Sequence, residues 1–572
     1  GNILVRGAIV KSGANSATLN LTADKNITVN QRIGLADGDA VSAGNLNVNL
    51  TAGGNIELNA VVDARQGNVT LNATGANSTV TQTQAIRANG LELRGQNAGY
   101  TLTNASNAVN TLAGNVKTAN YVNSTALTIG SVGTSTGLTT SGDMTVSGTT
   151  GVDNKYGLTV SNAVKSTGGK IALTGTHTQN AGNQTNVGIW VAANIGDANS
   201  GEISLTGTSG TSTGIFLNGG LISSTKKITL TGTAGGGGLG VNFNGGNGIT
   251  SLAGGGDFAG ADAISITGTA INNLGVWVRN AAVTNNSTNG RTYISGTATN
   301  VTGTSLSNAV TATSGNIVIE GTTLAGGNNA LIVNATGSVS TAGNIRATGV
   351  SQGSGLGVYG QGSVTSTNGS IDISGTSVTG GGVTLTGTVT AQNSVSISGT
   401  SSSAASGNQG VIIQNAVKAT TGDITVTGNT NSNIQRAVAI KANGAVNGSL
   451  QTLAAGRNIN INADTLLVNT ASSVDAGATG TVNIKTTTLG GAVKLGSGDT
   501  MNSTPTSRVL GLDQGELDTI KAGKLVIGSA TGGNISMASA ISTKSATGHL
   551  ELQTGGNITL DKALTVGDVG AR

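Results

Sequence analysis

Side chains that could carry out catalysis or hold a transition metal are few in this sequence. Among its 572 residues there are two histidines, His177 and His549, and no cysteine. The two histidines stand far apart in the sequence, and a zinc site needs several His or Cys ligands together. A thiolate nucleophile is excluded outright. The sequence therefore predicts a protein with no metal site and no cofactor.

The carboxylates are also thinly spread. Two closely spaced pairs, Asp37/Asp39 and Asp257/Asp262, both lie in glycine-rich segments. Aspartate is common in turns, whereas glycan hydrolysis needs two carboxylates that flank one bond. We therefore interpret both pairs as turn residues rather than as catalytic or calcium-binding groups, and predict that the protein is not an enzyme.

The aromatic residues are better candidates for binding. They make up only 2% of the chain, yet four of them follow a glycine and an aliphatic residue in short apolar segments. Side chains alternate between the two faces of a strand, so each ring points outward if the preceding aliphatic residue points inward. An outward column of rings would suit a sugar face or a partner chain. The predicted contact residues are Trp190, Phe216, Trp277 and Tyr359. The alternative is that loops of the same chain cover them.

These rings must be positioned by a short repeat. A turn glycine, an alternating strand and Thr/Ser-Gly recur, for example at 169–175, 201–207 and 369–375. A second and a shorter third strand follow, as at 383–385 and 388–390. The first strands are expected to begin at 171, 203, 228, 264, 293, 317, 345, 371, 395, 424 and 459.

A repeat of this length cannot bury its own apolar face, so successive copies have to stack. Three strands in about 25 residues leave no room for a crossover helix, which predicts an all-β parallel β-helix. At about 4.8 Å per turn, some 20 turns would give a rod on the order of 100 Å. We expect irregular turns over 1–125, regular turns over 126–460, and turns with a short helical insertion near 513–521 over 461–572. The copies of Gly-Asn-apolar could stack as amide ladders between turns.

The composition of the chain also limits which class of protein it can belong to. Hydrophobic residues are 36% and charged residues 9%, with one proline, which argues against disorder. The net charge of +4 comes without a basic run, so no nucleic-acid surface is expected. No apolar stretch is long enough for a membrane helix. The absence of cysteine favours an exported protein. Because the chain opens and closes within the pattern, we interpret it as a piece of a longer protein.

Two longer phrases carry a family resemblance. The segments 100–113 (YTLTNASNAVNTLA) and 510–528 (LGLDQGELDTIKAGKLVIG) resemble signatures of filamentous haemagglutinin-like exoproteins. The Gly-Asn-Ile and Ile-Thr-Leu-Thr-Gly turns are similar to the same group, which includes high-molecular-weight adhesins of two-partner secretion systems. The resemblance implies a right-handed parallel β-helix, passage through an outer-membrane secretion pore, and a place at or outside the Gram-negative cell surface. The Asn-Pro-Asn motifs of the family's secretion domain are absent from this sequence.

The sequence thus predicts a non-catalytic adhesin or fibre that displays a binding surface for cells, glycans or matrix. A second hypothesis is a subunit that self-associates into an extracellular filament or sheath. A third is a β-helix enzyme that degrades polysaccharides, which the scattered carboxylates disfavour.

Overall fold

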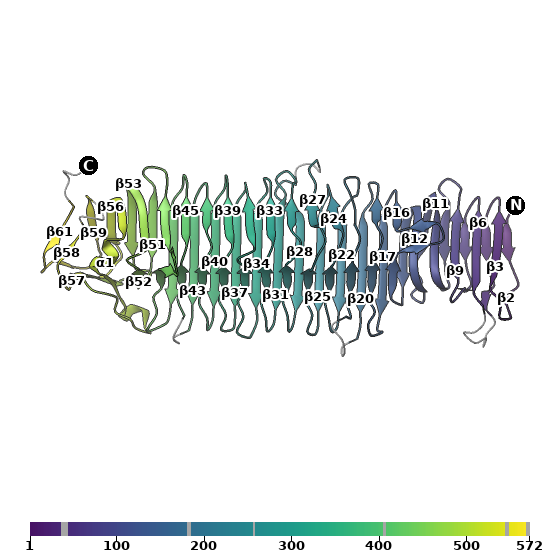
Figure 1. The fold of residues 1–572 in the computed structure, drawn as a ribbon, viewed down its shortest axis with the longest axis horizontal. Coiled ribbons are helices and arrows are strands. Elements are labelled where there is room, and N and C mark those ends of the chain that lie inside the picture. Colours follow the sequence, from purple (N-terminus) through teal and green to yellow (C-terminus); the bar gives the residue numbers. More distant parts are fainter. Residues whose placement is uncertain (36–43, 180–184, 255–257, 404–407, 544–547, 568–572) are drawn as a thin grey trace. The chain divides into compact units, whose positions relative to one another are not determined.

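The computed structural model describes residues 1–35, 44–179, 185–254, 258–403, 408–543 and 548–567. They form two compact units, Gly1–Thr288 and Asn289–Arg572. The chain folds as a parallel β-solenoid of about 20 turns with a repeat of about 27 residues, and 54% of it is strand. Within each unit the strands of successive turns lie side by side (Figure 1). The predicted all-β parallel β-helix is confirmed.

In the first unit the regular turns build three parallel columns of strands, and the turn over 171–195 contributes only the single bridging residue Ile195 to the third. The first column contains β17 (Met144–Thr150), β20 (Ile171–His177), β22 (Ile203–Ser209), β25 (Ile228–Ala234) and β28 (Asp262–Ala270). The second contains β13 (Leu127–Ile129), β18 (Leu158–Val160), β21 (Ile189–Val191), β23 (Ile215–Leu217), β26 (Val241–Phe243) and β29 (Val276–Val278). The third contains β16 (Leu138–Thr140), β19 (Val164–Ser166), β24 (Leu221–Ser224), β27 (Gly248–Ser251) and β30 (Val283–Asn285).

The second unit repeats these columns. Its first column contains β31 (Arg291–Ala298), β34 (Ile317–Thr323), β37 (Ile345–Ser351), β40 (Ile371–Ser377), β43 (Val395–Ser401), β46 (Ile424–Thr430) and β51 (Asn458–Asn462). The second contains β32 (Thr304–Leu306), β35 (Leu331–Val333), β38 (Val358–Gly360), β41 (Val383–Leu385), β44 (Val411–Ile413), β47 (Val438–Ile440) and β52 (Leu466–Val468). The third contains β33 (Ala309–Ala312), β36 (Ser338–Thr341), β39 (Ser363–Ser366), β42 (Val389–Ala391), β45 (Ala416–Ala419) and β50 (Ser449–Thr452).

The first turns of the chain are less regular. Short strands there are β1 (Ile3–Val5), β2 (Ile9–Lys11), β4 (Ile27–Val29), β5 (Ile33–Leu35), β7 (Ile56–Leu58), β8 (Val62–Asp63) and β10 (Thr79–Gln82). Longer ones are β3 (Ala17–Ala23), β6 (Leu46–Ala52), β9 (Asn68–Ala73), β11 (Ile86–Leu102) and β12 (Ala108–Asn123). β12 pairs with β13, β16 and β17, so the regular three-column pattern begins at this strand.

The register of the first strands matches the repeated phrase. Ile171, Ile203, Ile228 and Ile264 are aligned and buried, and so are the glycines of their Thr-Gly pairs. One expectation was wrong by a residue: Thr292, not Tyr293, aligns with Ile317. Thr292 points inward and is fully buried, so a threonine occupies a position at which an aliphatic residue was expected.

The glycine in the repeated phrase is required by a close approach of two backbones. A Cβ atom on Gly232 would lie 2.0 Å from the carbonyl oxygen of Gly240, which directly precedes β26. In the second unit a Cβ on Gly399 would lie 2.0 Å from the carbonyl oxygen of Gly410, which precedes β44. A side chain cannot fit between the first and second strands at this corner, so the glycine sets their spacing.

Asparagines of the Gly-Asn-apolar copies link successive turns, although the ladder differs from stacked amides. The side-chain Oδ1 of Asn2 accepts the backbone N–H of Asn26 (3.0 Å), and Oδ1 of Asn55 accepts that of Thr79 (2.9 Å). In the second unit Oδ1 of Asn316 accepts the N–H of Asn344 (2.9 Å). Each asparagine therefore satisfies a backbone donor in the next turn just before the first strand.

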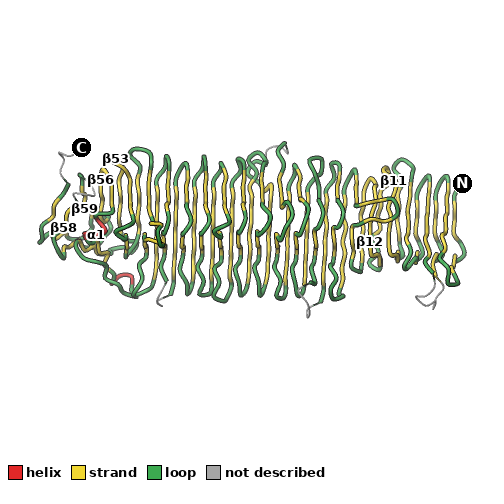
Figure 2. The backbone as a smooth tube through the Cα atoms, viewed as in Figure 1, coloured by secondary structure: helices red, strands yellow, loops and turns green. Residues whose placement is uncertain are grey.

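The last part of the second unit departs from the three columns. Its strands are β53 (Ser473–Lys485), β54 (Ala492–Leu495), β55 (Val509–Leu512), β56 (Ile520–Gly528), β57 (Ile535–Met537), β58 (Ile541–Ser542), β59 (Leu550–Gln553), β60 (Ile558–Thr559) and β61 (Leu564–Thr565). Helix among the described residues is confined to η1 (Pro505–Ser507) and α1 (Gln514–Leu517), as Figure 2 shows. A helix lies within the predicted insertion near 513–521, with Asp513 and Glu516 as its capping box. It is shorter than predicted, because α1 ends at Leu517 and Ile520 already begins β56.

We expect Gly232→Ala to destabilise the first unit by about 1–3 kcal/mol, the usual range for overpacking a tightly packed core. The added methyl group would collide with the backbone of Gly240. Gly237→Ala is the matched control, because a Cβ there would meet no atom within 4 Å. Thermal unfolding followed by circular dichroism would measure both variants. Equal melting temperatures for the two would contradict this account of the repeat.

Candidate binding surface

Two of the predicted aromatic residues lie next to each other on the outward face of the second column. Trp190 in β21 is in register with Phe216 in β23. Ile189 and Ile215, which precede the two rings, are fully buried. Because side chains alternate along a strand, both rings point away from the core, and both are partly exposed. The predicted orientation is confirmed for this pair.

The two rings belong to a stack of three. The centroids of Trp190 and Phe216 lie 4.5 Å apart with 17° between the ring planes. Tyr156 covers the other side of Trp190, with centroids 4.8 Å apart and planes at 13°. The distance between Trp190 and Phe216 matches the spacing of neighbouring strands, so the sheet itself holds these two rings in stacking contact. We call Tyr156, Trp190 and Phe216 the aromatic stack.

Tyr156 was missed by the sequence analysis. It precedes β18 and reaches the stack from a loop, so it does not occupy the strand position that its neighbours share. Thr159 holds that position in its turn, in register with Trp190. The repeat pattern contains no signal for a ring supplied by a loop.

The four predicted rings do not form one contiguous stripe. Asn242 lies in register between Phe216 and Trp277 and is almost completely buried. The guanidinium carbon of Arg279 lies 4.5 Å from the centroid of Trp277, a cation–π contact. The prediction of a contiguous column was therefore wrong, because an asparagine interrupts it and an arginine covers the next ring.

Tyr359 belongs to the second unit. It lies in register between Ile332 and Thr384 and is partly exposed, and its hydroxyl accepts a hydrogen bond from Nε2 of Gln361 (3.1 Å). No other ring neighbours it in the column. That any of the four rings contacts a ligand stays a prediction.

The histidines and the paired aspartates do not come together. His177 is buried in β20, and its Nε2 donates to the carbonyl oxygen of Val152 (2.9 Å). His549 lies in the second unit and is exposed. Asp262 begins β28, whereas Asp37, Asp39 and Asp257 lie outside the described residues. Across the described ranges, no three His, Cys, Asp or Glu side chains are grouped closely enough to hold a metal ion.

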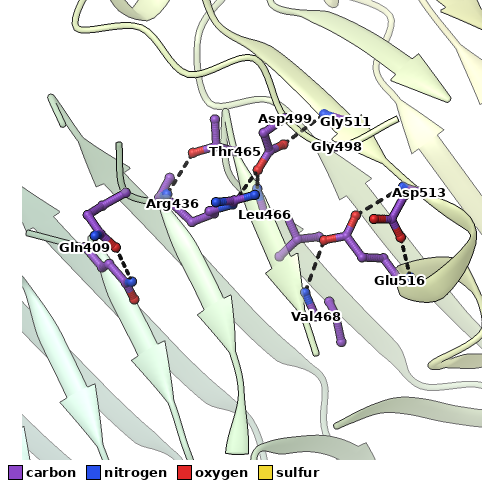
Figure 3. A network of polar contacts seen from close by, with 12 residues as sticks. Gln409, Arg436, Thr465, Leu466, Val468, Gly498, Asp499, Gly511, Asp513 and Glu516 are labelled. Carbon is purple, nitrogen blue, oxygen red and sulfur yellow. Dashed lines mark hydrogen bonds and ion pairs between the residues drawn. The ribbon is translucent and has the colours of Figure 1, made fainter. Parts of the chain in front are cut away.

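A pair of buried carboxylates in the second unit was not predicted (Figure 3). Oδ2 of Asp499 accepts the backbone N–H of Leu466 (3.0 Å) and lies 3.1 Å from Nε of Arg436. Oε1 of Glu516 accepts the N–H of Val468 (3.3 Å). Leu466 and Val468 are the two ends of β52. In the preceding turn the N–H of Val438, which is in register with Leu466, donates instead to the backbone carbonyl oxygen of Thr465 in the next turn. The carboxylates thus replace the strand that would follow β52.

Both carboxyl groups are hard to ionise in the fold. Burial raises the pKa of Asp499 to about 7, although the N–H of Gly511 and the Arg436 guanidinium lower it. Burial also raises the pKa of Glu516 to about 8, and the nearby Asp499 adds to this rise. These groups seal the edge of a sheet, and an unpaired edge would expose backbone donors. We therefore assign the pair a structural role.

Two more buried carboxylates in the first unit are also held by polar partners. Glu92 accepts hydrogen bonds from the backbone N–H of Thr134 (3.0 Å) and the hydroxyl of Ser135 (2.9 Å). Burial raises the pKa of Glu92, but these hydrogen bonds outweigh it and the net shift is downward. Asp63 lies within 3.7 Å of a guanidinium nitrogen of Arg32. Neither carboxylate lies beside the aromatic stack in the register of the strands.

Comparison with known proteins does not assign the chain to a family. No protein-family model and no curated protein matches it. Within the described part of the chain, no helix combines the length and the apolar character needed to cross a membrane.

The raised pKa values predict a pH-dependent stability at the end of β52. A carboxyl group whose pKa is higher in the folded than in the unfolded state stabilises the fold at low pH. That stabilisation is lost as the pH rises from the unfolded pKa, about 4, to the folded pKa. We therefore expect the wild-type transition of this region to move to lower temperature between pH 5.5 and pH 8. Scanning calorimetry would follow it. D499N/E516Q should remove this part of the pH dependence, and an unchanged dependence in the double variant would contradict the assignment.

Proposed function

We propose that this protein is a non-catalytic extracellular scaffold that displays a binding surface, in the manner of a bacterial adhesin. The observation that carries the proposal is the aromatic stack on the outward face of the second column. The chain has three Phe, two Trp and five Tyr, and three of these residues meet at this one place. Flat apolar rings held partly open to solvent are typical of interaction surfaces.

The composition of the solenoid strengthens this argument. Most of its inward positions are filled by Ile, Val, Leu and Ala, and Ile189 and Ile215 are the buried residues next to the two rings, so packing of the core does not require the rings. Outward positions of the first strands are mostly Thr and Ser, for example Thr229 and Thr231 in β25. Such side chains suit an exposed strand. Rings at the outward positions of β21 and β23 therefore have no evident role in the core, which favours a role in binding.

The extracellular location is also part of the proposal. It is supported by the absence of cysteine and by the resemblance of segments 100–113 and 510–528 to filamentous haemagglutinin-like exoproteins. Export through an outer-membrane pore of a two-partner secretion system follows from the same resemblance. Attachment by such a scaffold would gain strength from several copies that bind one surface together.

We expect W190S/F216S to weaken attachment on the order of tenfold, the loss typical of truncated interface rings. Beads coated with the chain would be scored for adhesion to epithelial cells and to immobilised extracellular matrix. Ile412→Ser is the matched control, because Ile412 is a partly exposed outward residue of the same column in the second unit. Full adhesion by a folded W190S/F216S chain would overturn the proposed surface. Failure of the wild-type beads to adhere would overturn the proposed function.

A further inference from the structure

A groove of about 670 Å³ lies beside the aromatic stack in the first unit. Thr128 and Thr159 line it and are in register with each other, and Thr159 is in register with Trp190. These two threonines therefore lie in the same outward column as the rings, one and two turns before Trp190. The groove opens where the second column begins, because β13 is its first separate strand.

One wall of the groove is a loop over residues 150–156 that buried polar side chains hold in place. His177, only 1% exposed, donates from Nε2 to the carbonyl oxygen of Val152. Asn186, fully buried, accepts the backbone N–H of Asn154 (2.9 Å) and donates to Asp153 (2.8 Å). Asn154 has a φ of 59°, a left-handed conformation that an asparagine tolerates. The wall is thus preorganised, since two buried side chains have their hydrogen bonds committed to it.

Tyr156 joins the groove to the aromatic stack. It lines the groove, while Trp190 covers one face of its ring. A ligand in the groove can therefore meet the Tyr156 side chain, whose orientation is fixed by stacking. The rest of the lining mixes hydroxyl and amide side chains, among them Thr128, Thr159 and Asn110, with apolar ones such as Leu127 and Val152. Lys155 is the one charged residue among the described residues that line it.

The aromatic ring and the polar side chains of the groove together indicate which class of ligand it would bind. A pyranose ring presents an apolar C–H face to an aromatic ring and hydroxyl groups at its edge, which match the ring and the polar rim of the groove. An acidic ligand would be expected to meet several cations, and a basic one several carboxylates. The lining offers neither, so the ligand should be uncharged. The volume falls within the range of small-molecule sites.

We propose that this groove binds a neutral oligosaccharide, with one pyranose ring packed on Tyr156. The inference rests on the proposed binding function and deepens it by naming the ligand class and a residue outside the predicted set. A protein segment is the competing occupant. Its extended backbone would bind through the polar groups of the groove and would not require a ring at position 156.

Isothermal titration calorimetry with lactose, cellohexaose and chitohexaose would test the proposal. We expect saturable binding of at least one of them to the wild-type chain. Tyr156→Ala should weaken that binding at least tenfold, whereas Tyr156→Phe, which keeps the ring, should stay within about threefold of wild type. Tyr293→Ala is the matched control, because Tyr293 is an outward tyrosine in β31 of the second unit. Circular dichroism would establish that each variant is folded.

The outcomes separate this proposal from the proposed function. No binding of any of the three oligosaccharides at millimolar concentration would overturn the groove as a glycan site, and so would unchanged binding by folded Tyr156→Ala. If wild-type beads still adhere to cells or matrix in either case, the binding function stands and its ligand lies elsewhere. In a Trp277→Phe background Trp190 is the only tryptophan. A change in its fluorescence on titration would place the sugar beside the stack, and no change on saturation would contradict that placement.

Discussion

The close approach of two backbones at the corner between the first and second strands is the constraint on which each regular turn depends. A Cβ on Gly207 would lie 2.2 Å from the carbonyl oxygen of Gly214, and one on Gly375 would lie 2.2 Å from that of Gly382. With no side chain at these positions, the two strands pack tightly enough for a core of Ile, Val and Leu. The same corner recurs in register along each unit, so it also aligns the outward positions. The stacking of Trp190 on Phe216 follows from that alignment.

A corner this tight buries backbone carbonyl groups, and buried polar groups need partners. Hydroxyl side chains at strand ends supply them. Ser377, at the end of β40, donates to the carbonyl oxygen of Gly355 (2.7 Å) and accepts the N–H of Gly380 (2.7 Å). Ser401, at the end of β43, donates to the carbonyl oxygen of Gly380 (2.6 Å). The serines and threonines of the repeat thus have two roles, since those facing outward favour strand formation and those facing inward satisfy the turns.

These roles explain which parts of the structure could be predicted from the sequence. The columns, the turn positions and the outward direction of Trp190 and Phe216 follow from a local period that each turn repeats. The interruption at Asn242 could also have been predicted, since its place between Phe216 and Trp277 can be counted from the repeat. Tyr156, Asp499 and Glu516 could not be predicted in this way. Each of these three side chains contacts a residue in another turn, and each is positioned by a loop or a helix that the repeat does not contain.

The non-repeating residues occur where a column begins or ends. At the end of the second column, no described strand follows β52, and Asp499 and Glu516 accept its N–H groups at the cost of burying two carboxyl groups. At the beginning of the same column in the first unit, a groove is lined by β13 and by the loop that His177 and Asn186 hold. The first arrangement closes a sheet edge and the second leaves a surface open beside an aromatic ring. Neither arrangement arises within the regular repeat, because there each strand pairs with the strand of the next turn. In a solenoid, binding sites are therefore best sought where the columns change.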